Sequence, residues 1–513
     1  MAKGLLLLTS ESSMRLLTNK EGAIRSGEGP MRNVLWLLLT LVFLSATGGG
    51  GAAVLYVGGF DVSRTESSGQ DGPLASIQSA INAARSGDTV VVQPGKYVEN
   101  IDFLGKAITV RSKDPENPSI VATTIIDGGK KGSVVTFDSS ESAASVLSGF
   151  IITNGLADWG GGIYCGLWTV PTVRNNRIVE NTALQGGGGI YCAYSITASR
   201  NVISFNHANL VGGGIFADSS SWPLLTSNFI INNSAGDSGG GIFCAQFCIG
   251  RIINNTVADN SAPVLGGGLY CAFAAPEVWN CIFWGNGDDL YGWGGGYLCV
   301  EDTGGENEGT GNIHQNPSFV NRALQDYHLL SSSPCIGRGS TNAPSMPALD
   351  YDGETIPFRT AADIGADEFV DFDSDTLPDF WEKKWFGNLT KPAGADSDAD
   401  QLTNAKELVA GTDPTKPDTD GDKCLDGVEV LAGTDPLDPA SFFAISSFFR
   451  SASQLTLRWA TAPGRWYQLY ISNDLKTWSQ LGSAIRASGN SLQSTITLAK
   501  SIRIRFFKVQ VQP

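Results

Sequence analysis

The 513-residue sequence is poor in several residue types that would point to a specific chemistry. It holds only three histidines, so catalytic schemes that need histidine as a general base have few candidates. No CxxC pair occurs among its nine cysteines, which disfavours a zinc site built on paired cysteines. No apolar run reaches the ~20 residues that a membrane-spanning helix needs. The chain therefore lacks the simplest signatures of histidine-based catalysis, structural zinc and transmembrane anchoring.

Positive charge is also scarce. The 35 Lys and Arg residues face 51 Asp and Glu residues, which gives a net charge of −16. The excess of acidic residues is concentrated in residues 371–439, with 17 acidic and 6 basic residues. Residues 440–513, by contrast, hold 1 acidic and 9 basic residues. Because phosphate binding needs a basic surface, we expect no nucleic-acid partner. The length and the uneven charge both indicate several domains.

Residues 31–48 have the pattern of a secretory signal peptide. Met31-Arg32 precedes an apolar run, Val34–Leu44, which is followed by small residues. The true start is either Met31 or the first residue with a long polar region before the signal. In both cases we expect a secreted or cell-surface protein with no transmembrane segment after signal cleavage.

The middle of the chain repeats with a fixed period. Glycine triplets begin at Gly160, Gly187, Gly212, Gly239 and Gly266, with a sixth at Gly294. No GK[ST] follows them, so they are turn or packing residues and not phosphate-binding loops. A period of 25–28 residues indicates a solenoid whose repeats stack on one another.

Each repeat contains an apolar strand and, later, a second apolar residue between two asparagines. The first strand of the first repeat is Ile163-Tyr164-Cys165, in which the first and third side chains share a face. We expect the asparagine amides to bond to one another along the stack and to tolerate left-handed turns. The second apolar column is Ile178, Ile203, Ile230, Val257 and Ile282, and the asparagine columns are Asn176, Asn201, Asn228, Asn255, Asn280 and Asn181, Asn206, Asn233, Asn260, Asn286.

These features predict a right-handed parallel β-helix, with Ile77–Ala84 as a helix that caps its open end. Five cysteines fall at one repeat position: Cys165, Cys192, Cys244, Cys271 and Cys299. Side chains stacked in parallel seldom match the dihedral angle of a disulfide, so we expect buried thiols that act as small apolar groups, with disulfides as the alternative.

The repeats resemble those of bacterial right-handed β-helix surface proteins, including the polymorphic outer-membrane proteins. IQSAINAARSGDTVVVQPGKYVENI (Ile77–Ile101) is similar to the start of secreted pectin-lyase-like proteins, and ADIGADEF (Ala362–Phe369) to the segment that closes such solenoids. The resemblance implies a β-helix over residues 54–370, after an N-terminal extension with signal over residues 1–53.

The acidic segment carries three loops with one spacing. Calcium takes six to eight oxygen ligands, and a 12-residue loop supplies them from positions 1, 3, 5, 7 (a backbone carbonyl), 9 and a glutamate at 12. The alternative is a solvated acidic linker. The candidate calcium ligands are Asp371, Asp373, Asp375, Leu377, Asp379 and Glu382 in loop 1, Asp396, Asp398, Asp400, Leu402, Asn404 and Glu407 in loop 2, and Asp418, Asp420, Asp422, Cys424, Asp426 and Glu429 in loop 3.

ELVAGTDPTKPDTDGD (Glu407–Asp422) resembles bacterial thrombospondin type 3 repeats, which implies structural Ca²⁺ over residues 371–439. One departure concerns position 6, where the sharp turn favours glycine. This chain has Thr376, Gln401 and Lys423 there. We expect calcium binding to be weakened most in the loop at Asp418, because Lys423 adds a positive charge.

Residues 440–513 alternate apolar and polar side chains and predict a small antiparallel β-sandwich. With SNDLKTW (Ser472–Trp478), they resemble a C-terminal module of secreted bacterial proteins. The whole chain is thus predicted to be mainly β: a parallel β-helix, calcium-binding repeats and a terminal sandwich.

No complete catalytic constellation is visible. The carboxylates available for acid–base work are the isolated pair Asp288-Asp289 and the turn residues Asp158, Asp218 and Asp237. Trp159, Trp168, Trp222 and Trp284 could stack on sugars or pack inside the protein. We expect a protein that binds an extracellular polysaccharide or cell-surface glycan. The alternatives are a polysaccharide lyase or glycoside hydrolase with an unrecognised site, and a structural spacer.

Overall fold

A computed structural model of the chain describes residues 6–7, 15–16, 52–58, 74–451, 453–497 and 506–512. The predicted signal peptide lies outside these residues. Two units are distinguished, residues 1–51 and 52–513. In the first, strands β1 (Leu6–Leu7) and β2 (Arg15–Leu16) pair antiparallel. Among the described residues, no helix is both long and apolar enough to cross a membrane.

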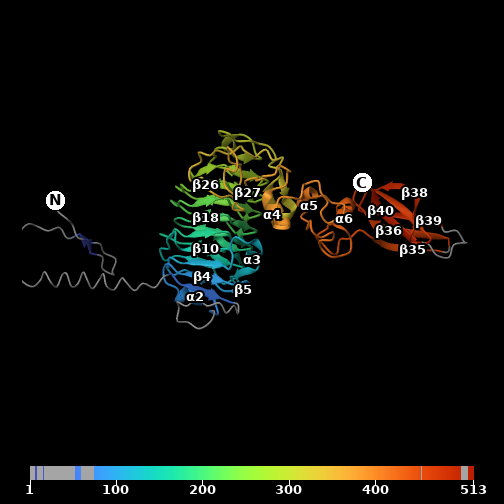
Figure 1. Cartoon of the computed structure of the whole chain (residues 1–513). Helices are drawn as coiled ribbons and strands as arrows, with labels where there is room; N and C mark the ends of the chain where they lie inside the picture. The colour runs from blue at the N-terminus through green and yellow to red at the C-terminus, as the bar shows by residue number, and fades with distance from the viewer. Residues whose placement is uncertain are drawn as a thin grey trace, which may run out of the picture. The chain divides into compact units, whose positions relative to one another are not determined.

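A parallel β-solenoid forms the first part of the second unit, as predicted (Figure 1). Sheet 1 consists of β3 (Val54–Val57), β4 (Thr89–Val92), β7 (Thr109–Ser112), β10 (Val146–Ser148), β14 (Thr172–Arg174), β18 (Thr197–Ser199), β22 (Leu224–Thr226), β26 (Arg251–Ile253) and β29 (Glu277–Trp279). Sheet 2 consists of β5 (Gly95–Val98), β8 (Thr124–Asp127), β11 (Ile151–Thr153), β15 (Arg177–Val179), β19 (Val202–Ser204), β23 (Phe229–Ile231), β27 (Thr256–Ala258), β30 (Ile282–Trp284) and β32 (Cys299–Val300).

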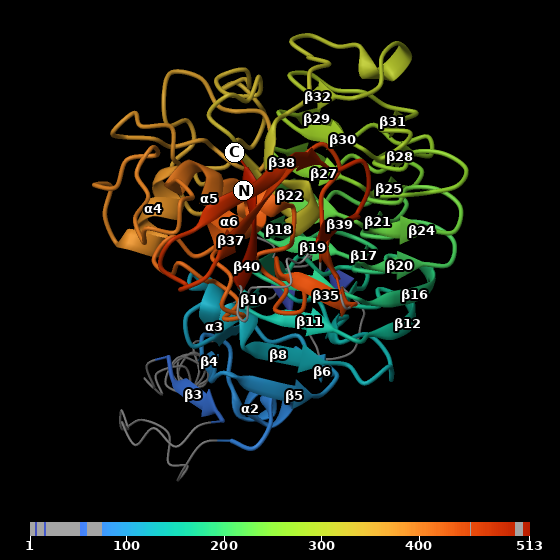
Figure 2. The same cartoon turned by 90° about the vertical axis from the view of Figure 1, so that its right-hand side faces the viewer.

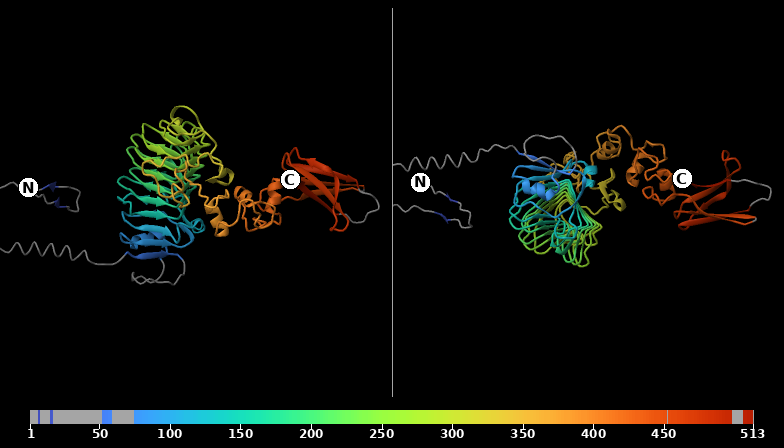
Figure 3. Two further views of the ribbon diagram at one scale, coloured as in Figure 1. Left: turned by 45° about the horizontal axis from the view of Figure 1, so that its top comes forward. Right: turned by 90° about the horizontal axis from the view of Figure 1, so that it is seen from below.

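Two further sheets complete the coils. Sheet 3 consists of β6 (Ile101–Asp102), β9 (Val135–Phe137), β13 (Ile163–Cys165), β17 (Ile190–Cys192), β21 (Ile215–Ala217), β25 (Ile242–Cys244), β28 (Leu269–Cys271) and β31 (Leu290–Tyr291). A short fourth sheet runs along one side of the solenoid and consists of β12 (Leu156–Trp159), β16 (Thr182–Gly186), β20 (His207–Ala208) and β24 (Ser234–Ala235) (Figure 2). Viewed along the stack, successive coils overlie one another (Figure 3, right).

A helix covers the N-terminal end of the solenoid, and a later segment packs along sheet 2. Helix α2 (Ile77–Ala83) contacts β3, β4 and β6 and buries Ile77, Ala80 and Ile81, which confirms the predicted cap. Helix α3 (Pro118–Ala122) lies between β7 and β8. Toward the other end lie η1 (Gly305–Asn307), β33 (Phe319–Asn321), η2 (Arg322–Leu324) and β34 (Asp326–Leu329). We call residues 319–369 the closing segment. Its residues Ile364, Ala366 and Phe369 pack on the outer side chains of sheet 2.

The predicted apolar column is correct as far as Val257, but its last member is one residue away from the predicted one. Ile178, Ile203, Ile230 and Val257 pair in register and are fully buried. Phe283, and not Ile282, continues this column, because Val257 pairs with Phe283. Ile282 points outward and packs with residues of the closing segment. The prediction was wrong here because a short coil carries isoleucine beside the correct position.

The asparagine ladders form as predicted, with the same one-residue error. The Oδ1 atom of Asn201 accepts the backbone N–H of Asn176 at 3.0 Å, and the Nδ2 atom of Asn176 also donates to it. The second ladder extends to Asn286. In the first ladder Cys281 follows Asn255, and Asn280 instead bonds to Asn254. The left-handed residues lie one position before each column, as at Asn175 and Asn254, so the expected left-handed role of the column itself was wrong.

The first five glycine triplets occupy equivalent turns, but the sixth does not. Gly160 has φ of +63°, and a Cβ on Gly161 would collide with the backbone carbonyl of Thr182. In the last coil Leu269 pairs with Leu290 and its N–H bonds to the carbonyl of Asp289, so residues 287–289 take the place expected for the triplet at Gly294. Cys299 consequently lies in sheet 2, outside the predicted thiol column. The other four column cysteines are buried free thiols, as predicted.

The rest of the chain contains short helices and two antiparallel sheets. Helices α4 (Asp379–Phe386), α5 (Asn404–Ala410) and α6 (Asp426–Ala432) each end at a left-handed glycine. The predicted sandwich is confirmed and buries Trp459 and Tyr467 between its sheets. Its strands are β35 (Ile445–Arg450), β36 (Gln454–Ala460) and β39 (Ser491–Thr497) in one sheet, and β38 (Ser479–Arg486), β37 (Trp466–Ser472) and β40 (Phe506–Gln512) in the other.

Candidate calcium-binding loops and surface aromatic residues

The aspartates at positions 1, 3 and 5 converge in all three loops. In each loop one oxygen from each aspartate lies within 4.8 Å of the other two. The loop backbone holds the first of them in place: in loop 1, Asp371 accepts the N–H groups of Ser374 and Thr376 at 2.7 and 3.1 Å. Loops 2 and 3 repeat this arrangement around Asp396 and Asp418.

The glutamates at position 12 are buried beside these aspartates with oxygens that have no hydrogen-bond partner. Both carboxylate oxygens of Glu382 are unpartnered, as is one oxygen each of Glu407 and Glu429. Burial and the neighbouring aspartates raise the pKa of Glu382 to about 7 and that of Glu407 to about 8. An unpartnered buried carboxylate is costly, and a cation among these oxygens would remove that cost. The oxygen-only donor set fits Ca²⁺.

The position-9 side chains differ from loop to loop in their contacts. Asp379 accepts the N–H of Phe372 and pairs with Lys383, both at 2.9 Å. Asp426 accepts both the N–H and the hydroxyl of Thr419. Each of these two aspartates therefore fixes the backbone of the residue at position 2 of its own loop. Asn404, by contrast, has a buried Oδ1 atom with no partner.

Position 6 adopts the left-handed backbone despite its side chains. The φ angles are +85° at Thr376, +81° at Gln401 and +80° at Lys423. Glycine would adopt this conformation without strain, which explains the expected preference. At position 7 the N–H groups of Leu377, Leu402 and Cys424 bond to the position-5 aspartates at 2.7–2.8 Å. The carbonyls of these residues remain predicted ligands.

The loops are joined by contacts that sequence spacing did not reveal. The second oxygen of Asp375 accepts the N–H of Ala393, just before loop 2, at 2.6 Å. The second oxygen of Asp400 accepts the N–H of Gly427 in α6, also at 2.6 Å. A Cβ at Gly427 would collide with the backbone of loop 2. Position 5 therefore connects each of the first two loops to the segment that follows it.

A stripe of exposed aromatic residues lies on the turn between sheets 3 and 1. Four of its side chains are 67% (Trp168), 48% (Trp222), 64% (Phe247) and 88% (Phe273) exposed. Tyr194 links the first two, with ring centroids 5.1 Å from Trp168 and 5.4 Å from Trp222. We call these five residues the aromatic stripe. Tyr194, Phe247 and Phe273 were not predicted, although each follows the strand of sheet 3 by two or three residues in its repeat.

The other two tryptophans considered for sugar stacking face other parts of the protein. Trp159 packs on Tyr191 and Phe216, with ring centroids 5.2 and 5.3 Å away. Trp284 is buried under the closing segment. Of the four candidates, only Trp168 and Trp222 therefore offer a broad free face.

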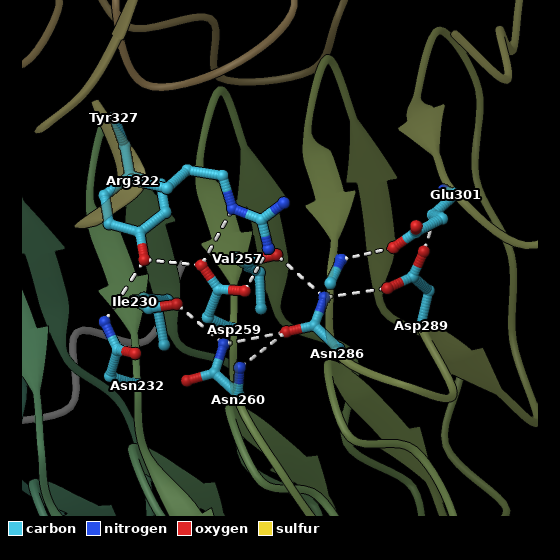
Figure 4. A network of polar contacts seen from close by, with 11 residues as sticks. Ile230, Asn232, Val257, Asp259, Asn260, Asn286, Asp289, Glu301, Arg322 and Tyr327 are labelled. Atoms are coloured by element: carbon cyan, nitrogen blue, oxygen red, sulfur yellow. Dashed lines mark hydrogen bonds and ion pairs between the residues drawn. The ribbon is translucent and has the colours of Figure 1, made fainter. Parts of the chain in front are cut away.

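Three of the carboxylates considered for acid–base chemistry are engaged in the fold. Asp289 is buried and takes hydrogen bonds from Asn286 and from the N–H of Glu301, so it ends the second asparagine ladder (Figure 4). Burial raises its pKa to about 6. Asp288 accepts the N–H of Gly266. Asp218 accepts the hydroxyl of Tyr191 at 2.5 Å.

Asp158 and Asp237 are exposed, Asp237 on a turn as predicted and Asp158 in strand β12 of the fourth sheet, so its predicted place on a turn was wrong. Figure 4 also shows Asp259, which joins the coil to Arg322 and Tyr327 of the closing segment. The carboxylates near the last coils thus hold the end of the solenoid together.

Two protein families match parts of this chain. One, described as "Right handed beta helix region", matches residues 142–313, which gives the solenoid the predicted right hand. The other, "Bacterial TSP3 repeat", matches residues 396–417 and 418–439 and therefore covers loops 2 and 3 but not loop 1. The chain is similar to the crystal structure of pectate lyase Pel9A at 15% identity, over 63% of this chain and 98% of that one, with a TM-score of 0.35. No curated protein matches it.

Proposed function

We propose that the chain is a secreted or cell-surface protein that binds an extracellular polysaccharide along its β-helix, without cleaving it, and that Ca²⁺ orders residues 371–439. The aromatic stripe carries this proposal. Its rings are held on a stack of coils about 4.8 Å apart, so they form a long exposed surface. Aromatic faces pack on the C–H faces of sugar rings, and an extended polymer could contact several rings at once.

Two further observations support the proposal. Thrombospondin type 3 repeats favour a location outside the cell, where calcium is abundant. The carboxylates Asp218, Asp288 and Asp289, which hydrolysis would need as free acids and bases, already accept hydrogen bonds within the fold.

Binding to pectins, alginates and other uronic-acid polymers in millimolar Ca²⁺ tests the proposal, by affinity electrophoresis and calorimetry. We expect Trp168→Ala with Trp222→Ala to weaken binding at least about tenfold, since each stacked ring is worth about 1 kcal/mol. Trp466→Ala is the matched control, because this tryptophan of the sandwich is also 48% exposed.

Cleavage is followed in the same samples through reducing ends and the absorbance of unsaturated products. Release of either product would contradict the non-enzymatic part of the proposal. Absence of both binding and cleavage across the polymers would contradict the glycan ligand and favour a structural spacer.

A further inference from the structure

Three ligand-type side chains converge in the closing segment, away from the calcium-type loops. His328 lies on β34, and Asp352 and Asp367 come from the chain that follows. A nitrogen of His328 and one oxygen from each aspartate lie within 4.8 Å of one another. We call these residues the His328 cluster. Neither matching family covers them, and no sequence motif marks them.

One oxygen in the His328 cluster, Oδ1 of Asp367, has no hydrogen-bond partner. Nε2 of His328 and Oδ2 of Asp352 lie 3.0 Å apart and have no other partner. Asp367 is only 4% exposed, so its free oxygen is hidden from water. Its other oxygen accepts the N–H of Leu329 at 2.6 Å, which fixes the carboxylate. Leaving such an oxygen unpaired is costly.

Neighbouring carboxylates in the same segment are satisfied by the backbone. Asp350, Asp363 and Glu368 each accept two backbone N–H groups, one on each oxygen. These three residues therefore have a structural role that needs no ion. Asp367 accepts only one N–H, and its carboxylate lies beside His328 and Asp352.

His328 is oriented as a metal ligand would be. Its Nδ1 atom lies 2.6 Å from Oδ1 of Asp326, which leaves Nε2 directed at Asp352, 3.0 Å away. The ring is held between Phe229 and Phe380, with centroids 5.4 and 4.5 Å away. A carboxylate on one nitrogen commonly fixes the tautomer and the direction of a histidine that binds metal through the other.

We propose that His328, Asp352 and Asp367 bind one divalent transition-metal ion, of which Zn²⁺ is the best fit, as a structural site that fastens the closing segment. One imidazole and two carboxylates suit Zn²⁺ better than Ca²⁺, whose ligands are oxygens. Water or the nearby Glu354, which also has a buried unpartnered oxygen, completes four ligands. Asp352 also lines a surface pocket of about 120 Å³.

The test uses the purified full chain, stripped of metal and then kept in 2 mM Ca²⁺ (about the level that fills extracellular calcium modules) so that the loops are occupied. Zn²⁺ is added, excess is removed and bound zinc is measured. We expect about one Zn²⁺ per chain and a rise in melting temperature, because an ion that binds only the folded state stabilises it. Co²⁺ in place of Zn²⁺ is expected to show visible absorption from a histidine-bound, four-coordinate ion.

Variants separate this site from the calcium loops. His328→Gln and Asp352→Asn are expected to weaken zinc binding at least about a hundredfold, and Asp326→Asn, which only orients the ring, about 10–100-fold. His314→Gln is the matched control, since the Nδ1 atom of His314 lies 3.0 Å from the carbonyl of Val300, outside the cluster.

Three outcomes would overturn the proposal. They are no zinc retained by the wild type, equal retention by wild type and both ligand variants, and displacement of zinc by millimolar Ca²⁺. If His328→Gln does not fold, the proposal is tested by zinc retention in Asp352→Asn and by the effect of zinc on the melting temperature of the wild type.

Discussion

The β-helix and the calcium-type loops are both regular repeats, but their repeated polar groups are stabilised in opposite ways. In the β-helix each buried asparagine bonds to the next coil, as Asn233 does with Asn206 and Asn260. In the loops each buried glutamate at position 12 keeps at least one oxygen without a partner. The stacked coils thus pair their own buried polar groups, whereas the loops leave buried carboxylate oxygens unpaired.

The largest expected effect comes from a charge placed inside the β-helix. Ile230→Asp buries a carboxylate among Ile203, Val257 and other apolar side chains, where nothing can pair with it. We expect a loss of several kcal/mol of stability and poor secretion. The measurement is thermal unfolding followed by circular dichroism.

Ile230→Val is the control for this change, because it removes one methylene group and should cost about 0.5–1.5 kcal/mol. If Ile230→Asp melted and was secreted like the wild type, the column would have to face outward.

Calcium removal should affect the calcium-type loops and leave the β-helix unchanged. With a chelator, the carboxylates of residues 371–439 repel one another without a counter-ion, and we expect this segment to become sensitive to protease. When the free ion concentration is 100 times the dissociation constant, binding adds about 2.7 kcal/mol to the free energy of unfolding. Limited proteolysis with mass spectrometry locates the cuts.

The β-helix serves as the internal control for calcium removal and should keep its resistance to protease. An identical cleavage pattern with chelator and with millimolar Ca²⁺ would contradict the calcium assignment.

A smaller effect is expected from breaking one step of the amide ladder. Asn233→Ala removes the acceptor of the Asn206 N–H and the donor to the Ile203 carbonyl. Leaving these buried groups unpaired should cost about 1–3 kcal/mol. Asn209→Ala, on an exposed turn, is the matched control and should change the melting temperature little. Equal melting of the two variants would mean that the ladder does not stabilise the coils.

The sequence predicted the solenoid and the loop spacing because both depend on local periodicity. It placed Ile230, Asn233 and the aspartates at positions 1, 3 and 5 in the environments that the structure shows. It failed where a coil changes length: Ile282 and Asn280 are the same residue types as their columns, but sit one position early. Periodicity alone cannot detect such a shift when the neighbouring residue also fits.

The sequence could not predict contacts between distant segments. The His328 cluster needs residues 328, 352 and 367 to meet through the fold of the closing segment. The role of Asp400 as a bridge to Gly427 likewise depends on how loop 2 packs against α6. No fixed spacing marks either arrangement, because irregular chain connects the partners.

The smallest expected effect concerns Lys423 in loop 3. Its φ of +80° is a strained left-handed conformation, and its charge repels a cation. Lys423→Gly removes both penalties and should tighten calcium binding at loop 3 about threefold to tenfold, as measured by calorimetry. Lys423→Gln removes only the charge, so the difference between the two variants reports the backbone strain. Because exposed charge is screened, the gain of Lys423→Gln should shrink in high salt, while the additional gain of Lys423→Gly should persist. Equal affinities for the two variants would show that the left-handed turn costs nothing at this position.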